Sequence, residues 1–206
     1  LTDADKRSSI ANLQISLPAI VIGGGLTAID TATELLAYYP IQIEKTAERY
    51  RQLSSQHGRE HVRKLFDDEE WETLSTHLAH AAELDAEMGT AAREGRMPQV
   101  QRLLDKWGGV SLVYRKSLAD SPAYRLNHEE VAKSLEEGVR YIEDLSPVEA
   151  VLDERHHVKA VKFVRADKSM VELPARTVCV AAGTSPNITY EKEYEGTFKL
   201  DSKRKY

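Results

Sequence analysis

Cysteine is almost absent from this sequence. Its 206 residues include one cysteine, Cys179. A single thiol excludes a disulfide framework, a cysteine pair for redox exchange and cysteine ligation of an iron–sulfur cluster. Cys179 lies in the apolar run TVCVAAG. Because unpaired cysteines are commonly buried, we expect a small buried strand residue there, not a reactive group.

Long apolar runs and a strong charge bias are also missing. No run reaches the roughly 20 apolar residues that span a bilayer, and the first residues do not follow the pattern of a signal peptide. The net charge of −5 gives no general affinity for nucleic acid or anionic membranes. We therefore expect a cytoplasmic globular protein that binds neither.

The ends of the chain suggest a fragment. The sequence begins at Leu1 without a methionine and ends on the charged run DSKRKY. We therefore expect a domain taken from a longer protein.

The stretch PAIVIGGGLTAIDTATE, residues 18–34, holds the most informative motif. Residues 19–22 predict a strand, and residues 26–39 predict a helix that Pro40 closes. Between them, GGGLTA (23–28) has the pattern G-x-G-x-x-A of a dinucleotide-binding turn. The position of this pattern, after a strand and before a helix, makes it more specific than the glycines alone.

Each position of that turn has a physical role. Gly23 permits the tight turn out of the strand, Gly25 leaves room for the pyrophosphate beside Gly24, and Ala28 allows the helix to pack close to the sheet. The free N–H groups of Leu26 and Thr27 and the helix dipole would face the phosphates. We therefore expect a pyrophosphate site at residues 23–27.

Residues 41–107 have a different character, rich in Glu, Arg, Lys, Gln, Leu and Ala. They predict helices over 42–53, 60–66, 68–88 and 98–107, the last beginning at a proline and ending at two glycines. The stripe Trp71, Leu74, Leu78, Ala81 and Leu84 has helical spacing and favours a core contact, although a role in docking a partner stays open.

The remaining residues return to strands and turns. VSLVY (110–114) predicts a buried strand, residues 127–138 a helix with a capping asparagine, and VRYIED a further strand. VEAVLDE, VKAVKFV and MVELPA alternate like an antiparallel meander, and RTVCVAA (176–182) predicts a central strand. The fold class is therefore α/β: a Rossmann-like parallel sheet (1–40 and 108–206) with a β-meander and a large helical insertion (41–107) in the first crossover.

The choice of dinucleotide depends on the end of the second strand, where two positions compete. Glu44 lies 19 positions after Gly25, and an acid there would hold the ribose of NADH. Alternatively, the strand VSLVY ends in Arg115 and Lys116, two cations that suit the 2′-phosphate of NADPH. IQIE (41–44) fits a helix better than a strand, so we prefer Arg115 and Lys116, and NADPH over NADH.

Five motifs in this order carry a resemblance to a known family: VIGGGLTAIDTA, VSLVYRKS, EEVAKSLEEGVRYIE, SPVEAV and VCVAAGTSPN. The sequence resembles the NADPH-binding domain of glutamate synthase small-subunit-like enzymes. These are FAD-dependent pyridine nucleotide-disulfide oxidoreductases of the glutathione-reductase fold. The match covers about two-thirds of the chain, everything except residues 1–17 and the helical insertion.

The resemblance implies functional residues. Gly23, Gly25 and Thr27 would line the pyrophosphate, Arg115 and Lys116 the 2′-phosphate, and Ala182 and Gly183 the region near the nicotinamide. The family commonly has a second arginine where this chain has Lys116. Arg125 is either a third cation or an exposed loop arginine.

The resemblance also implies a flavin partner outside this chain. The family carries a separate FAD domain with its own glycine fingerprint, and this chain has one fingerprint. The full-length enzyme would pass hydride from NADPH to FAD and electrons onward to an acceptor protein or subunit, whereas the fragment alone would be inactive. No residue receives a catalytic role, because the cofactors carry the chemistry. The alternative is a non-catalytic nucleotide-binding or interaction module that uses the helical insertion.

Three histidine groups could suggest a metal site. His57 to His61 reads H-x-x-E-H, the spacing of a zinc peptidase helix. Gly58 weakens that helix and no third ligand is evident, so we interpret it as a solvated face, as we do His77 and His80. The pair His156-His157 predicts a turn. We therefore assign no metal.

Overall fold

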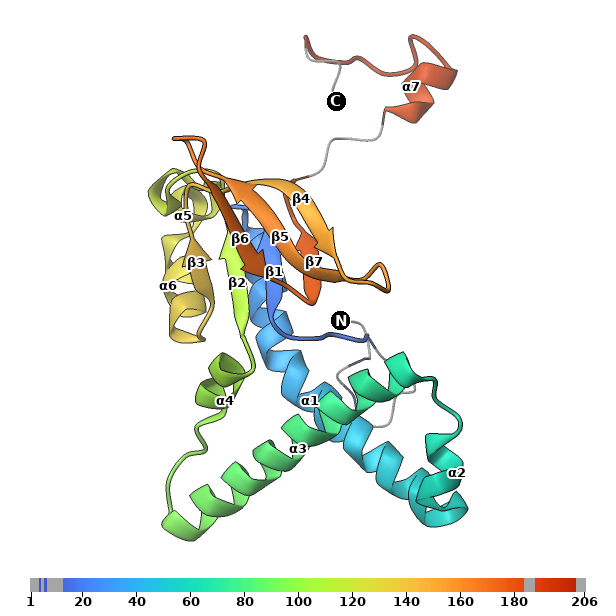
Figure 1. The fold of residues 1–206 in the computed structure, drawn as a ribbon. Coiled ribbons are helices and arrows are strands. Elements are labelled where there is room, and N and C mark those ends of the chain that lie inside the picture. Colours follow the sequence, from blue (N-terminus) through green and yellow to red (C-terminus); the bar gives the residue numbers. More distant parts are fainter. Residues whose placement is uncertain (1–3, 5, 7–12, 184–187, 203–206) are drawn as a thin grey trace.

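The computed structural model describes residues 4, 6, 13–183 and 188–202. It has an α/β fold with two sheets (Figure 1). The parallel sheet has the order β3-β2-β1-β7 and comprises β1 (Ala19–Ile22), β2 (Val110–Val113), β3 (Arg140–Ile142) and β7 (Thr177–Val180). The antiparallel sheet comprises β4 (Ser146–Leu152), β5 (Val158–Val164) and β6 (Met170–Pro174).

The helices fall into two groups. Those before β2 are α1 (Leu26–His57), α2 (Arg59–Arg63), α3 (Asp68–Glu94) and α4 (Val100–Lys106). Those after β2 are η1, a 3₁₀ turn (Leu118–Asp120), α5 (Pro122–Leu126), α6 (His128–Glu136) and α7 (Thr189–Glu193). Across the described ranges, every helix is too short or too polar to span a bilayer.

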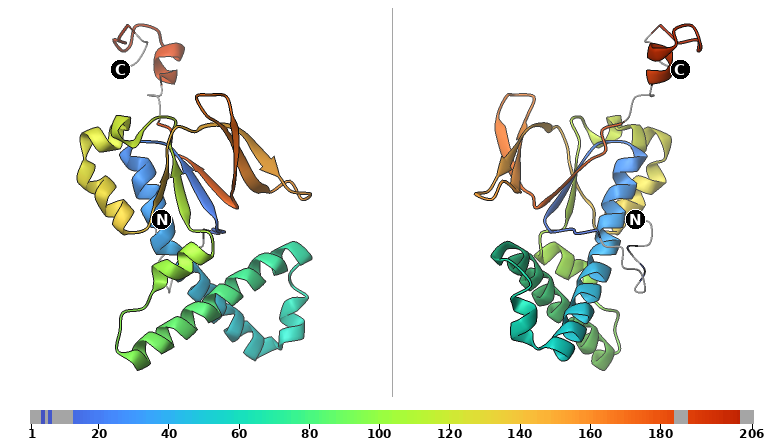
Figure 2. Two further views of the ribbon diagram at one scale, coloured as in Figure 1. Left: turned by 60° about the vertical axis from the view of Figure 1, so that its left-hand side comes forward. Right: turned by 90° about the vertical axis from the view of Figure 1, so that its right-hand side faces the viewer.

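The predicted α/β architecture is confirmed. β1 pairs in parallel with both β2 and β7, and Ile22 at its end lies opposite Val113 and Val180. The meander pairs in the order β4-β5-β6, as its alternating pattern predicts. Successive side chains of β1 point to opposite faces: Val21 belongs to a core beneath α1, and Ile20 to a core beneath the meander. Figure 2 shows helices and meander on opposite sides of the parallel sheet.

Pro40 does not end the first helix, contrary to the sequence interpretation. α1 runs through it to His57. Tyr38, Tyr39 and Ile43 are each at most 1% exposed, so a buried face continues on both sides of the proline. Burying a side chain such as Ile43 contributes roughly 1.5–3 kcal/mol, and several together outweigh the roughly 3 kcal/mol that an interior proline costs. The helical insertion is therefore the second half of α1 with α2, α3 and α4.

The position of β7 also differs from the prediction. RTVCVAA was expected to form a central strand, but β7 lies at an edge and, within the described residues, pairs with β1 alone. Val180 is 74% exposed. An apolar run indicates that both faces of a strand are covered, but it does not determine whether the strand lies in the centre or at the edge of the sheet.

Candidate nucleotide-binding site

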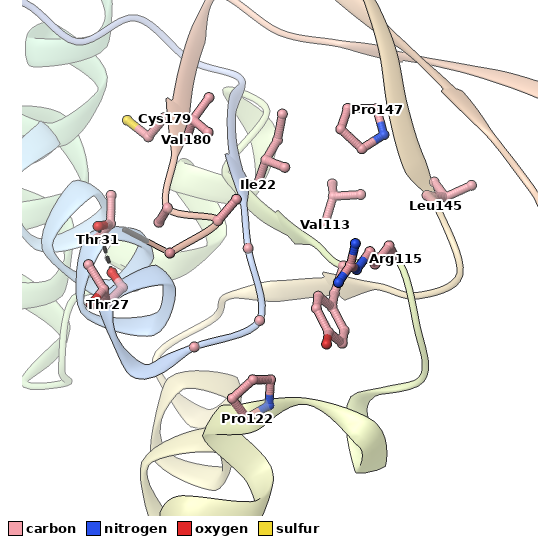
Figure 3. A pocket seen from close by; sticks show the side chains of 17 residues that line it. Ile22, Thr27, Thr31, Val113, Arg115, Pro122, Leu145, Pro147, Cys179 and Val180 are labelled. Atoms are coloured by element: carbon pink, nitrogen blue, oxygen red, sulfur yellow. Dashed lines mark hydrogen bonds between the residues drawn. The ribbon is translucent and has the colours of Figure 1, made fainter. Parts of the chain in front are cut away.

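A cavity of about 680 Å³ opens where β1, β2 and β7 end (Figure 3). Because the strands are parallel, their carboxyl ends meet at one edge, where open α/β sheets bind ligands. Its lining residues come from six parts of the chain: Ile22, Gly23, Gly24, Gly25, Thr27, Thr31, Val113, Tyr114, Arg115, Pro122, Leu145, Pro147, Cys179, Val180, Ala181, Ala182 and Gly183. The volume is within the roughly 300–1,000 Å³ typical of ligand pockets.

Most of the predicted site residues meet in this cavity. Gly23, Gly24, Gly25, Thr27, Arg115, Ala182 and Gly183 line it. Leu26 and Lys116 do not belong to the lining. In Figure 3, Thr27 and Thr31 lie on one side of the cavity and Arg115 on the other. The glycine turn and the cation predicted for it, 90 positions apart in sequence, therefore face a common space.

The three glycines of the turn have different surroundings. A Cβ on Gly23 would overlap the carbonyl oxygen of Ala181, and one on Gly24 would overlap the ring of Tyr114. A Cβ on Gly25 would meet no atom within 4 Å. Gly23 and Gly24 therefore allow close packing of the protein itself, whereas the space beside Gly25 stays open on the cavity side.

The turn delivers the start of α1 to the cavity. Gly25 is the N-cap residue and supplies no side-chain cap. The first hydrogen bond of the helix runs from the Ala28 N–H to the Gly25 carbonyl, at 3.0 Å. The N–H groups of Leu26 and Thr27 come earlier in the helix and have no intrahelical acceptor. Such free N–H groups, together with the helix dipole, form a site for an anion.

The basic end of β2 supplies a cation. Arg115 follows β2 and is exposed, and within the described part of the chain it forms no ion pair with a carboxylate. Lys116 is also exposed but lies outside the lining.

The other candidate positions do not reach the cavity. Glu44, the competing position, belongs to α1 and follows no strand. The Arg125 guanidinium donates to the Asp120 carbonyl at 2.8 Å and takes no part in the lining.

An apolar wall completes the cavity. Leu145 and Pro147 come from the segment that begins β4, and Pro122 opens α5. Sequence reasoning missed these residues because each belongs to another element than the glycine turn. The motif SPVEAV marked the β4 segment as part of the resemblance but gave it no role in the site.

Cys179 lines the cavity as well, as a half-buried residue of β7. Burial raises the pKa of its thiol above the ordinary value, so the thiol stays protonated near neutral pH. A protonated thiol is a poor nucleophile. Cys179 is therefore a strand residue, as expected, but it is half-buried in the wall of the cavity and not fully buried.

The histidines of the sequence have two kinds of environment. His57 and His61 are exposed and belong to α1 and α2, separated by Gly58. His77, in contrast, is 5% exposed, and its Nε2 lies 3.1 Å from the Ile15 carbonyl oxygen. Within the described residues, no three His, Cys, Asp or Glu side chains gather as a metal site requires.

His80 packs in a similar way. Its ring stacks on Trp107 at 4.3 Å between centroids, and its Nδ1 lies 2.7 Å from the Tyr39 hydroxyl. The predicted solvated face is therefore wrong for His77 and His80. The pattern of α3 alone does not reveal that α1 and residues 13–17 supply their polar partners.

Comparisons with known proteins give one sequence relative and several distant structural likenesses. No protein-family model matches the chain. An uncharacterized protein of Rickettsia prowazekii (strain Madrid E), RP006, is 30% identical over an alignment that covers 90% of this chain and 27% of that protein. The chain therefore spans about a quarter of the length of this curated relative.

Three solved structures illustrate the structural likeness. T. acidophilum thioredoxin reductase has a TM-score of 0.44 at 14% identity, and the match covers 89% of this chain and 36% of the reductase chain. Bacillithiol disulfide reductase Bdr (YpdA) from Staphylococcus aureus has a TM-score of 0.43 at 12% identity, covering 91% and 35%. Lactococcus lactis thioredoxin reductase has a TM-score of 0.42 at 13% identity, covering 86% and 35%. At these TM-scores the likeness assigns no function.

Proposed function

We propose that this chain is the NAD(P)H-binding domain of an FAD-dependent oxidoreductase, similar to the small subunit of glutamate synthase. The longer protein would pass hydride from NADPH to a flavin held by a domain outside this chain. One observation carries the proposal: the glycine turn, the start of α1 and Arg115 line a single cavity at the carboxyl ends of three parallel strands.

The residues present suit a dinucleotide. The space beside Gly25 would accept the pyrophosphate, with the N–H groups of Leu26 and Thr27 as donors. The Arg115 guanidinium would bind the 2′-phosphate of the adenosine ribose through its planar fork. Lys116 would add a second positive charge nearby. Ala182 and Gly183 would approach the nicotinamide end, where small residues leave room for a ring.

The role of the protein in this proposal is to bind and orient. NADPH, when bound, supplies the hydride. The chain's own groups neutralise phosphate charge, and the apolar wall around Leu145 and Pro147 keeps water from one side of the cavity. We assign no residue to proton transfer. The chain alone should therefore bind NADPH without turnover, since the flavin that would accept the hydride lies outside it.

Calorimetric titration tests the proposal. NADPH should bind the chain more tightly than NADH, and Arg115→Glu should weaken NADPH binding by about tenfold to a hundredfold, since a bond between charged groups contributes roughly 1.5–3 kcal/mol. Binding of NADH should change much less, because NADH lacks the 2′-phosphate.

Arg165→Glu is the matched control, an exposed arginine of the turn between β5 and β6. It should leave both titrations unchanged. If neither dinucleotide binds at millimolar concentration, the proposed function is wrong. If Arg115→Glu keeps the wild-type preference for NADPH, the assignment of the 2′-phosphate to the end of β2 is wrong.

A further inference from the structure

The segment before β1 crosses the inserted helices. The structure describes Ala4, Lys6 and residues 13–18 of this segment, and we call these described residues the leader. Figure 1 shows residues 13–18 beside the crossing of α1 and α3, below the amino ends of the parallel strands. The cavity lies at the opposite, carboxyl ends. The leader and the proposed nucleotide site therefore occupy opposite edges of the sheet.

Gln42 binds the leader backbone at two points. Its Oε1 accepts from the Ile15 N–H at 2.6 Å, and its Nε2 donates to the Ile15 carbonyl at 2.8 Å. Gln42 is 0% exposed and Ile15 is 3% exposed. A buried side-chain amide that satisfies both polar groups of one residue fixes the position of that residue in the fold.

Three more side chains reach the leader in the same way. The Tyr38 hydroxyl accepts from the Leu13 N–H at 3.1 Å, and the Lys45 ammonium, 2% exposed, donates to the Ala4 carbonyl at 2.7 Å. The His77 ring from α3 meets the Ile15 carbonyl at 3.1 Å. All these bonds go to backbone atoms of the leader, so they depend on its path more than on its side chains.

The spacing of these residues requires a continuous α1. Tyr38, Gln42 and Lys45 are at positions i, i+4 and i+7, which share one face of a helix. They lie on both sides of Pro40, so a helix that ended there would not present them together. The passage of α1 through the proline therefore creates this binding face.

The other end of the leader is attached to β7. The Ser16 N–H donates to the Thr177 hydroxyl at 3.0 Å, and that hydroxyl donates to the Ser16 carbonyl at 2.8 Å. The Pro18 carbonyl accepts from the Arg176 N–H at 2.8 Å. β7 begins at this attachment, and its far end lines the cavity.

We propose that Tyr38, Gln42, Lys45 and His77 form a clasp, whose function is to hold the leader at the amino ends of the strands. Gln42, Lys45 and His77 belong to the helical insertion, so the insertion fixes the path of the leader and keeps it away from the cavity. This gives the insertion a role that does not depend on the proposed nucleotide binding, because none of the clasp residues lines the cavity.

Amide hydrogen exchange of the whole chain tests the clasp. In Gln42→Ala, the Ile15 and Leu13 amides should exchange about tenfold faster or more, because Ile15 loses its buried acceptor and Leu13 loses the backbone path that this bond fixes. The Val21 amide, inside β1, should be unchanged. Gln52→Ala is the matched control, since Gln52 lies on the exposed side of α1 and its side-chain amide donates to Glu48. In Gln52→Ala, the Leu13 and Ile15 amides should exchange at the wild-type rates.

Two milder variants keep the test decisive if Gln42→Ala disturbs the whole fold. Tyr38→Phe removes the hydroxyl that accepts from the Leu13 N–H and leaves the Gln42 amide in place, so it should accelerate Leu13 more than Ile15. Lys45→Met keeps the apolar stem and removes the donor to Ala4. The clasp is wrong if the Ile15 and Leu13 amides exchange at wild-type rates in all three variants, or at unfolded-chain rates in the wild type. A failure to bind NADPH would leave these outcomes unaffected and would contradict only the proposed function.

Discussion

At the scale of single residues, the glycine turn shows what a sequence pattern can and cannot predict. The pattern G-x-G-x-x-A indicates the turn because its demands are local: a tight exit from β1 and a small residue at Ala28, which is 0% exposed. The pattern does not reveal that Tyr114 covers Gly24, or that Leu145 and Pro147 close the cavity. Those contacts depend on elements far away in the sequence.

Two alanine substitutions should separate packing from binding in this turn. Gly23→Ala should destabilise the fold by about 1–3 kcal/mol, because its Cβ would overlap the Ala181 carbonyl. Gly25→Ala should leave the free energy of unfolding nearly unchanged, since its Cβ meets no atom, yet it should weaken NADPH binding. Urea unfolding and calorimetry measure the two quantities. Wild-type NADPH affinity in Gly25→Ala would contradict a pyrophosphate at this position.

The buried histidines should make the stability depend on pH. Burial lowers the pKa of His77 below its ordinary value of 6.5, against the bond to Ile15. Burial likewise lowers the pKa of His80, with Glu83 opposing and His77 and Lys106 adding to the effect. Below about pH 6.5 the unfolded chain therefore binds protons that the folded chain does not. Above that pH, His77 and His80 should not make the free energy of unfolding depend on pH. Below it, the free energy of unfolding should fall as the pH drops.

Urea unfolding between pH 7.5 and pH 5.5 measures this dependence. Each histidine contributes a slope of at most about 1.4 kcal/mol per pH unit. His77→Gln should reduce the slope, whereas Gln52→Ala, which removes no titratable group from an exposed position of α1, should not. A slope that His77→Gln leaves intact would show that His77 does not titrate in this range.

At the scale of elements, order and type could be predicted from the sequence, but several boundaries could not. α3 begins at the predicted Asp68 because Asp67 and Glu70 form a capping box, which is a local signal. α3 continues beyond the predicted Met88 to Glu94, where Gly95 adopts a left-handed conformation. α1 passes Pro40 because tertiary burial outweighs a local penalty. Local signals predict an element well until packing overrides them.

Replacing Pro40 should therefore stabilise the protein. Pro40→Ala restores an N–H donor for the Leu36 carbonyl and removes the steric conflict of the ring, so the free energy of unfolding should rise by as much as about 3 kcal/mol. Pro98→Ala, a proline before α4 and outside any helix interior, should change it by less than about 1 kcal/mol. Lower stability of Pro40→Ala would mean that packing of the ring contributes more than the lost hydrogen bond.

At the scale of the whole molecule, two kinds of contact attach the helical insertion. Apolar side chains of α3 such as Leu84 and Ala81, each 3% exposed, share the core with α1. Polar contacts join α3 to the turn between β4 and β5: the Arg155 guanidinium forms an ion pair with Glu72 at 3.0 Å, and the His157 ring lies 3.2 Å from the Glu69 carboxylate. Because these pairs are exposed, the apolar contacts should dominate.

Unfolding measurements on two variants compare these contacts. Leu84→Ala should cost about 2–5 kcal/mol, since it leaves a cavity in the core. Glu72→Gln should cost less than about 1 kcal/mol, and this cost should shrink further in high salt. A larger loss for Glu72→Gln than for Leu84→Ala would mean that the ion pairs hold the insertion.

The continuity of α1 also restricts how the length of this protein can vary. Its 32 residues form a rod of about 48 Å that begins at the glycine turn and carries Tyr38, Gln42 and Lys45 of the clasp near its middle. Adding or removing one residue inside the rod would rotate everything beyond it by about 100°, so Gln42 would no longer face the leader. The segment between α3 and α4 carries no such constraint on rotation. Homologues should therefore gain and lose residues around 95–99 and keep the spacing from Gly25 to Lys45 fixed.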